Sequence, residues 1–124
     1  MERIQNKPTI SIITPALNEE KNIQDAITNT LEALRDFGIR GEIVVVNDGS
    51  SDGTEELVAL MMERNNQVKM IKHEKPLGIG ASFWDGVDVA QGDIVAMFPG
   101  DNENDPREIL RYFGLLEHVD IVVP

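Results

Sequence analysis

The chain has 124 residues, of which 41% are hydrophobic, so it is long enough for one domain with a buried core and too apolar to be disordered. Its 22 acidic residues outnumber its 11 basic ones, and the net charge of −11 argues against a nucleic-acid partner. It has no cysteine, which excludes disulfides and thiolate metal sites and fits a reducing compartment.

Short β-branched runs alternate with amphipathic stretches along the chain. The run TISIIT (9–14) predicts a buried strand. Apolar residues at helical spacing follow it and predict a helix, with Asn18 as its N-cap and Gly38 as its stop. The run EIVVVN (42–47) predicts the second strand.

The second helix is expected to begin at Asp52, because Glu55 three residues later completes a capping box. Its apolar spacing predicts that Leu57, Leu60 and Met61 point inward. The run VKMIKH (68–73) predicts a third, less apolar strand.

The third helix is expected over residues 79–90, with an inward face that begins at Ile79 and includes Ser82 and Phe83. The run DIVAMF (93–98) predicts the fourth strand. Asp105 as a cap and Pro106 at the first helical position predict a short helix, and DIVVP then begins a fifth strand.

This succession of strand–helix units predicts an α/β fold, a mostly parallel sheet with helices on both faces. Ligands of such sheets bind beyond the carboxyl ends of the strands. The loops at that edge are PALNEE, NDGSSDG, EKPLGIG and PGDNEND, so we expect the site there.

The first two loops carry groups suited to a nucleoside. Pro15 would form a flat wall for a ring, and Asn18 and Glu19 offer hydrogen-bonding groups. Asp48 directly follows a buried strand, where a carboxylate can accept hydrogen bonds from a base or ribose. Each of these also has a structural alternative, since proline ends strands, asparagine caps helices and Asp48-Gly49 favours a tight turn.

The last two loops carry groups suited to phosphate and metal. Gly78 and Gly80 at a helix start would let the backbone approach a diphosphate, although two glycines are a weak motif and no Walker loop is present. Asp101 and Glu103 are hard oxygen ligands of the kind that Mg²⁺ and Mn²⁺ prefer, with a solvated turn as the alternative.

The two histidines, His73 and His118, have no ligand spacing between them, and we interpret both as surface or structural residues. No Ser-His-Asp or Cys-His arrangement can be assembled, which disfavours acyl transfer by a nucleophile.

Three patterns together resemble a known family: PALNEEKNI (15–23), VNDGSSDGT (46–54) and GASFWDGVDVAQGDI (80–94). In this order they are similar to the nucleotide-sugar half of a family 2 glycosyltransferase, in particular the dolichyl- or polyprenyl-phosphate sugar synthases. The resemblance covers roughly residues 9–124. It implies the Rossmann-like nucleotide-binding half of a GT-A fold. Residues 1–124 would then be the nucleotide-sugar-binding part of a glycosyltransferase domain, truncated at its C-terminus.

The resemblance also implies roles for the loop residues. Pro15, Asn18, Glu19 and Asp48 would line the base and ribose, with Gly78 and Gly80 beside the diphosphate. Asp101 matches the second aspartate of the family's D-x-D motif, which meets a divalent Mg or Mn cation and the diphosphate.

Four positions depart from the family pattern, and two of them, Pro76 and Ile79, replace a common Asn and Lys beside the glycines. Asn47 stands where the family often has an aspartate, and Pro99 occupies the first position of the D-x-D motif. The metal would therefore depend on Asp101, helped by Glu103.

The implied function is the inverting transfer of a sugar from a nucleoside-diphosphate sugar to a lipid-phosphate or saccharide acceptor. The catalytic base would lie beyond Pro124, and membrane helices often follow in this family. The N-terminal residues MERIQNKPTI contain no signal-peptide segment, so we expect a cytoplasmic protein, at the cytoplasmic face of the membrane in its full-length form.

Two alternatives remain open. A nucleotide-sugar-binding module without catalytic activity is favoured by Pro99 and by the missing base. A phospho-acceptor signalling domain is disfavoured, because Pro15 stands where that class needs an acidic pair.

Overall fold

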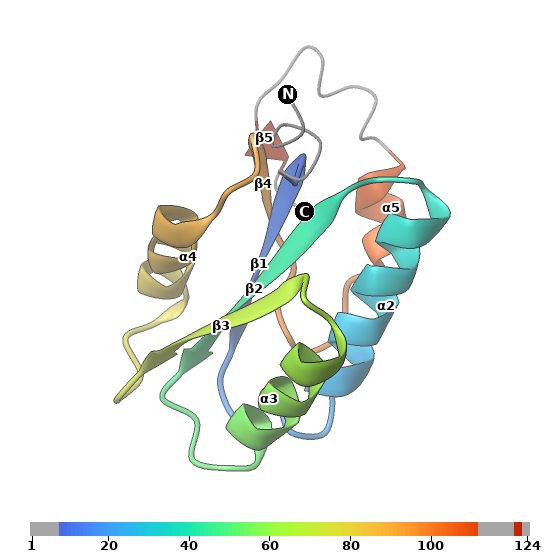
Figure 1. Ribbon diagram of the computed structural model, residues 1–124. Helices are drawn as coiled ribbons and strands as arrows, with labels where there is room; N and C mark the ends of the chain where they lie inside the picture. Colours follow the sequence, from blue (N-terminus) through green and yellow to red (C-terminus); the bar gives the residue numbers. More distant parts are fainter. Residues whose placement is uncertain (1–7, 112–120, 123–124) are drawn as a thin grey trace.

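The computed structural model describes residues 8–111 and 121–122 of the chain. It contains a five-stranded sheet in the order β3-β2-β1-β4-β5, and every strand pairing in it is parallel (Figure 1). The strands are β1 (Ile10–Ala16), β2 (Gly41–Asp48), β3 (Val68–His73), β4 (Ile94–Met97) and β5 (Ile121–Val122). The helices are α2 (Ile23–Asp36), α3 (Thr54–Arg64), α4 (Ile79–Val89) and α5 (Pro106–Leu110).

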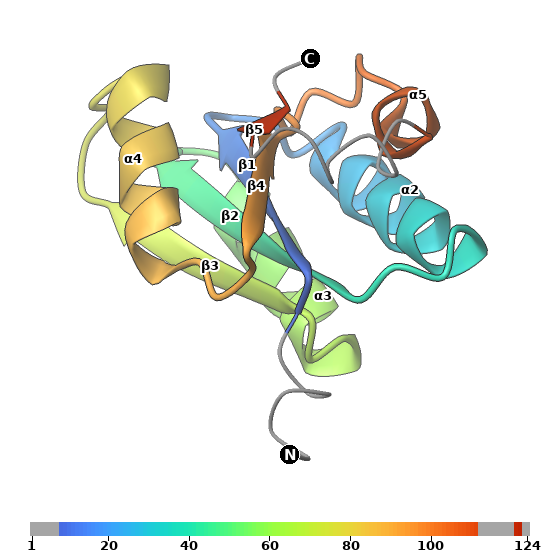
Figure 2. The same ribbon diagram turned by 90° about the horizontal axis from the view of Figure 1, so that it is seen from above.

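Helices cover both faces of the sheet, which confirms the predicted α/β class. Helices α2, α3 and α5 lie on one face and α4 lies on the other (Figures 1 and 2). The larger core forms between α2, α3 and α5 and inward strand residues such as Ile12, Ile43 and Val45. A smaller core under α4 contains Ile13, with Val44 and Val46 of β2. Because alternate side chains meet opposite helical layers, β1 and β2 are buried at every position and have apolar runs at their centres.

The strand order creates a crevice at one edge of the sheet. From the central strand β1 the chain continues to β2 and β3, and then crosses back to β4 on the other side of β1. The connection after β1 leads to β2 on one side and the connection after β4 leads to β5 on the other, and such a switch point in strand order is where open α/β sheets bind their ligands.

Helix α2 begins five residues after its predicted N-cap. Asn22 occupies the N-cap position and makes no side-chain capping bond, so the assignment of Asn18 as the cap was wrong. Asn18 has a left-handed backbone with a φ of 55°, and its side chain accepts a hydrogen bond from the Ser51 backbone in the next loop. Gly38 follows the helix with a φ of 67°, as expected of a helix stop.

Helix α3 also begins later than predicted, at Thr54 instead of Asp52. Asp52 still serves this helix start, since its Oδ1 accepts hydrogen bonds from the Thr54 backbone at 2.9 Å and hydroxyl at 2.5 Å. Glu55 does not complete a capping box and instead pairs with Lys72 at 2.9 Å. Leu60, expected inside, is 43% exposed.

The later elements follow the predictions more closely. Helix α4 spans nearly its predicted range, although Ile79 at its start is exposed and not part of the core face. Asp105 caps α5 as expected, because its side chain accepts a hydrogen bond from the Arg107 backbone. His118 and residues 123–124 lie outside the described residues. In the described part of the chain, no helix combines the length and apolar character that a bilayer crossing requires.

Candidate functional site

A cleft of about 260 Å³ opens at the carboxyl edge of the sheet. It is lined by the ends of β1, β2 and β4 and by the start of α4. The lining includes five of the seven residues predicted to bind a nucleotide: Pro15, Glu19, Asp48, Gly78 and Asp101. Side chains that are far apart in the sequence therefore meet in one place, as the switch-point argument requires.

The other predicted residues lie outside this lining. Asn18 and Gly80 are neighbours of lining residues but do not line the cleft themselves. Glu103 lines a separate hollow together with Asn29 and Arg107.

The loops after β1 and β2 are joined to each other by hydrogen bonds. The backbone N–H of Asn18 donates to the Ser50 hydroxyl at 2.9 Å, and its side-chain oxygen accepts from the Ser51 backbone at 2.7 Å. Two residues on, the Glu20 carboxylate accepts from the Gly53 backbone at 2.7 Å. We call these bonds the loop brace. It explains the polar residues of both motifs and fixes the rim that carries Glu19.

Asp48, the last residue of β2, is buried, and both of its carboxylate oxygens are hydrogen-bonded. Its Oδ1 accepts from the Leu77 backbone at 2.8 Å and lies 2.8 Å from His73 Nδ1, while its Oδ2 accepts from the Gly78 backbone at 3.0 Å. Burial by itself raises the pKa of Asp48, but the bonds from His73, Leu77 and Gly78 outweigh it and lower that pKa. The carboxylate is thus a charged anchor for the loop that precedes α4.

His73 lies between two carboxylates, and sequence reasoning did not assign it to the site. Its Nδ1 faces Asp48, and its Nε2 lies 2.7 Å from Asp85 of α4. The bond to Asp48 raises the pKa of His73, burial opposes this, and the bond to Asp85 adds to the rise. Both partners are distant in sequence, but Asp48 and His73 are paired in the register of β2 and β3, so aligning the strand ends is the signal that finds the contact.

The start of α4 forms the part of the cleft that suits a phosphate group. Gly78 precedes the helix with a φ of 104°, a conformation that favours glycine. A Cβ placed at Gly78 or Gly80 would meet no atom within 4 Å, so the backbone there is open to a ligand. Ser82 lines the cleft one turn later, and its fully buried hydroxyl has no hydrogen-bond partner among the described residues.

Asp101 reaches the cleft from the end of β4. The N–H of Gly100 donates to the Pro15 carbonyl at 2.9 Å and so ties this loop to β1. A Cβ at Gly100 would lie 2.8 Å from the end of the Ile23 side chain, so Gly100 packs closely against the start of α2. One oxygen of Asp101 accepts from the Glu103 backbone at 3.0 Å, and Glu103 lines the hollow that also includes Asn29 and Arg107.

No ready-made metal site occurs within residues 8–111 and 121–122, where no three His, Cys, Asp or Glu side chains form a group that could hold an ion. Asp101 is a single carboxylate at the cleft, and such a donor suits an ion that takes its other ligands from phosphates and water.

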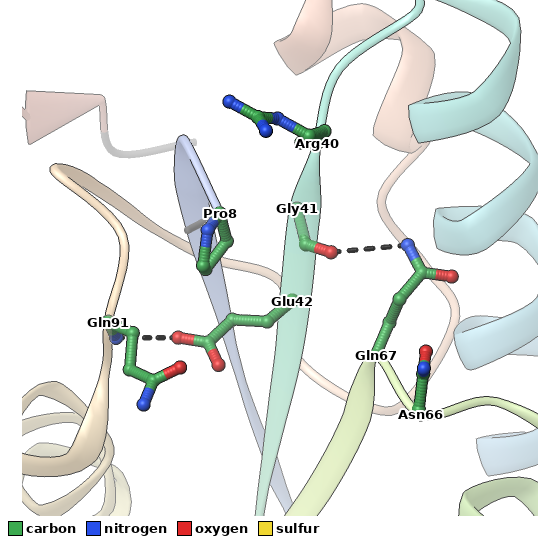
Figure 3. Close-up of a pocket in the computed structure, with 7 residues that line it drawn as sticks. All are labelled: Pro8, Arg40, Gly41, Glu42, Asn66, Gln67 and Gln91. Atoms are coloured by element: carbon green, nitrogen blue, oxygen red, sulfur yellow. Dashed lines mark hydrogen bonds between the residues drawn. The ribbon is translucent and has the colours of Figure 1, made fainter. Parts of the chain in front are cut away.

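A second hollow, of about 290 Å³, lies at the opposite edge of the sheet (Figure 3). The buried carboxylate of Glu42 points into its wall, where it accepts from the Gln91 backbone at 2.6 Å and the Ser11 hydroxyl at 2.5 Å. Lys69 pairs with its other oxygen at 2.8 Å. Glu42 of β2 thus joins Ser11 of β1, Lys69 of β3 and the turn after α4, which stabilises this edge of the sheet.

Comparison with known proteins agrees with this geometry. The family model described as Glycosyl transferase family 2 matches residues 11–124. The chain is 35% identical over 122 residues to the dolichyl-phosphate beta-glucosyltransferase ALG5D of Trichomonas vaginalis, across 93% of this chain and 36% of that protein. It is 26% identical over 113 residues to the dodecaprenyl-phosphate galacturonate synthase of Rhizobium johnstonii, across 90% of this chain and 33% of that protein.

Solved structures share the fold. A mannosyltransferase from Pyrobaculum calidifontis in complex with GDP-Man and Mn²⁺ matches with a TM-score of 0.71 and 26% identity, across 84% of this chain and 30% of that one. S. aureus TarS 1-349 in complex with UDP-GlcNAc matches with a TM-score of 0.71 and 25% identity, across 88% of this chain and 31% of that one. The chain spans about a third of the length of these relatives. Since the family model covers nearly all of its residues, the chain belongs to glycosyl transferase family 2.

Proposed function

We propose that this chain is the donor-binding part of an inverting glycosyltransferase, which takes a sugar from a nucleoside-diphosphate sugar. The observation that carries the proposal is the single cleft at which the ends of β1, β2 and β4 meet the start of α4. The names of similar proteins support the donor class, since one solved relative holds GDP-Man and another holds UDP-GlcNAc.

In this proposal the nucleoside lies against the β1 and β2 side of the cleft. Pro15 provides an apolar wall, and Glu19 offers a carboxylate from the braced rim. Asp48 contributes mainly by holding the loop before α4, because its oxygens already accept three hydrogen bonds. Asn18 supports the rim through the loop brace.

The diphosphate lies at the start of α4. The first N–H groups of an α-helix have no intrahelical acceptor, and the helix dipole favours negative charge there. Gly78 and Gly80 leave room for phosphate oxygens, and the unpartnered Ser82 hydroxyl is a further donor. These groups stabilise the charge that develops on the departing nucleoside diphosphate.

A divalent cation, Mg²⁺ or Mn²⁺, fits the donor set at Asp101. The second oxygen of Asp101 accepts no hydrogen bond from the described residues, and a carboxylate oxygen is a suitable ligand for either ion. When bound, the ion would neutralise part of the diphosphate charge. Glu103 belongs to a different hollow, so we propose Asp101 as the protein ligand of this loop.

The reaction is a single displacement with inversion. An acceptor oxygen attacks the anomeric carbon, the bond from that carbon to the diphosphate breaks, and its electron pair leaves with the nucleoside diphosphate. We place the base that removes a proton from a hydroxyl acceptor outside these 124 residues. The acceptor is a lipid phosphate or a saccharide, and the names of the relatives favour a polyprenyl phosphate. Such an acceptor would bring the whole protein to the cytoplasmic face of a membrane.

Thermal denaturation of the chain with UDP-, GDP- and dTDP-sugars, with and without Mn²⁺, tests the proposal. A ligand at ten times its Kd adds about 1.4 kcal/mol to the free energy of unfolding, which raises the Tm of a chain of this size by roughly 5 °C. We expect such a rise for one base, larger with Mn²⁺. The absence of any shift at millimolar nucleotide would contradict donor binding.

A nucleotide-sugar-binding module without turnover is the second candidate, and Pro99 in place of an acidic residue favours it. Both candidates predict nucleotide binding. Only a glycosyltransferase consumes the donor. An assay of sugar transfer, carried out with the protein in the form that its source organism makes, therefore separates the two candidates.

A further inference from the structure

The last residue of β3 connects three elements at the edge of the cleft. His73 bonds through Nδ1 to Asp48 at the end of β2 and through Nε2 to Asp85 in α4. Its side chain is only 9% exposed, and so is as buried as that of Asp48, which is 7% exposed. A histidine held at both nitrogens has one ring orientation, which fixes the relative positions of β2, β3 and α4.

The same contact controls the loop that lines the cleft. Oδ1 of Asp48 accepts from both His73 and Leu77, and Oδ2 accepts from Gly78. Residues 74–81 are exposed, and the bonds from Leu77 and Gly78 to Asp48 tie this loop to β2. Rotation of the Asp48 carboxylate would therefore release the Leu77 and Gly78 backbone and change the cleft wall at Gly78.

We propose that His73 is a positioning residue for donor binding, which orients Asp48 and the loop before α4 by bridging Asp48 and Asp85. The expected effect of His73 on donor binding rests on the proposed function. The bridge from His73 to Asp48 and Asp85 is a feature of the free protein and does not depend on that function. His73 itself does not line the cleft, so it acts through Asp48.

The bridge requires the imidazolium form of His73, because only that form donates from both nitrogens. The charged groups that face the ring are Asp48 from β2 and Asp85 from α4. The neighbouring Lys72 pairs with Glu55 of α3. Neutral His73 would keep one donor and present a lone pair to one carboxylate, so the bridge opens as pH rises.

Two substitutions separate the two bonds. Asparagine places its amide near the position of Nδ1, so His73→Asn keeps a donor toward Asp48. Glutamine places its amide near Nε2, so His73→Gln keeps a donor toward Asp85 only. We expect His73→Gln to weaken UDP or GDP binding about tenfold and His73→Asn to weaken it less, since a hydrogen bond to a charged group has about that effect. Lys72→Gln is the matched control, because it removes a cation from the adjoining position without touching Asp48.

Calorimetric titration with UDP and GDP in Mn²⁺, between about pH 6 and about pH 9, measures these affinities. Affinity of the wild type should fall with rising pH relative to His73→Asn, which shares the titration of the nucleotide but has no imidazole at this position. Lys72→Gln should follow the wild type. Equal affinities and parallel pH profiles for the wild type and His73→Gln would overturn the proposal.

Amide hydrogen exchange in the free protein distinguishes failure of this inference from failure of the proposed function. The Leu77 and Gly78 amides should be protected in the wild type and in Lys72→Gln, and lose about tenfold in protection in His73→Gln. A chain that shows this pattern but binds no nucleotide would refute donor binding and support the bridge. Unchanged protection in His73→Gln would refute the bridge whatever the nucleotide result.

Discussion

Gly49 offers a sharp test of how the loops at the cleft are packed. It follows Asp48 with a φ of 77°, and a Cβ at this position would lie 2.6 Å from the Lys75 carbonyl carbon and 2.6 Å from the Pro76 nitrogen. These are backbone atoms, which cannot move aside as the end of a side chain can. Gly49→Ala therefore forces the loop at residues 75–76 outward, next to the Leu77 amide that bonds Asp48.

The loss of unfolding free energy expected for Gly49→Ala is the sum of two contributions. A left-handed backbone costs an L-residue about 1–2 kcal/mol, and forcing extra volume into a packed region costs about 1–3 kcal/mol. We expect Gly49→Ala to lower the free energy of unfolding by about 2–5 kcal/mol. Gly38 is the matched control, since its φ is 67° but a Cβ there meets nothing within 4 Å. Gly38→Ala should cost about 1 kcal/mol, because the backbone contribution alone remains and is partly offset in the unfolded chain.

Urea denaturation followed by circular dichroism measures both values. With a slope of about 1–3 kcal/mol per molar, the two midpoints should differ by about 0.5 M or more. Nucleotide affinity should fall only in Gly49→Ala, because Gly38 follows the end of α2 at the other edge of the sheet. Equal destabilisation of the two variants would show that the backbone contact with residues 75–76 does not exist.

Three further predictions concern the cleft. Asp101→Ala should weaken nucleotide binding and remove most of its Mn²⁺ dependence, while Glu103→Ala leaves both near wild type; calorimetry in which the two variants behave alike would contradict the assignment. Ser82→Ala should keep or raise the free energy of unfolding, by up to about 1 kcal/mol, since it removes an unsatisfied buried hydroxyl, yet weaken nucleotide binding. Unweakened binding would show that this hydroxyl does not meet the ligand. Because the pKa of His73 is raised above 6.5, its stabilising contribution is full below about pH 6.5 and is lost as pH rises through the folded-state pKa. In Asp85→Asn this stabilising contribution of His73 should be lost at a lower pH than in the wild type. Curves of Tm against pH that coincide for the two proteins would contradict this prediction.

The strands were predictable because they are covered on both faces. Runs such as Ile12-Ile13 and Val44-Val45 leave no polar position, and a sheet with helical layers on each side is what such runs require. The edge of the sheet that carries the site followed from the same topology, and the cleft lies there.

The starts of α2 and α3 were not predictable from local patterns. Asn18 has the composition of a cap, but its side chain accepts from Ser51, 33 residues away, and that partner appears only when the two loops are folded together. His73 was read as surface or structural for a similar reason. The His73 side chain is largely buried and bonded to two side chains, which agrees with a structural residue and not with a surface one. Its partners are 25 and 12 residues distant, and no spacing rule connects them.

The loop brace has a practical consequence for engineering. Asn18 and Glu20 on one side, and Ser50, Ser51 and Gly53 on the other, exchange bonds in both directions. Grafting either segment alone from a homologue would leave backbone donors of its counterpart without acceptors. An attempt to redesign the selectivity of the proposed donor site should therefore transplant residues 17–22 and 49–54 together, as one cassette.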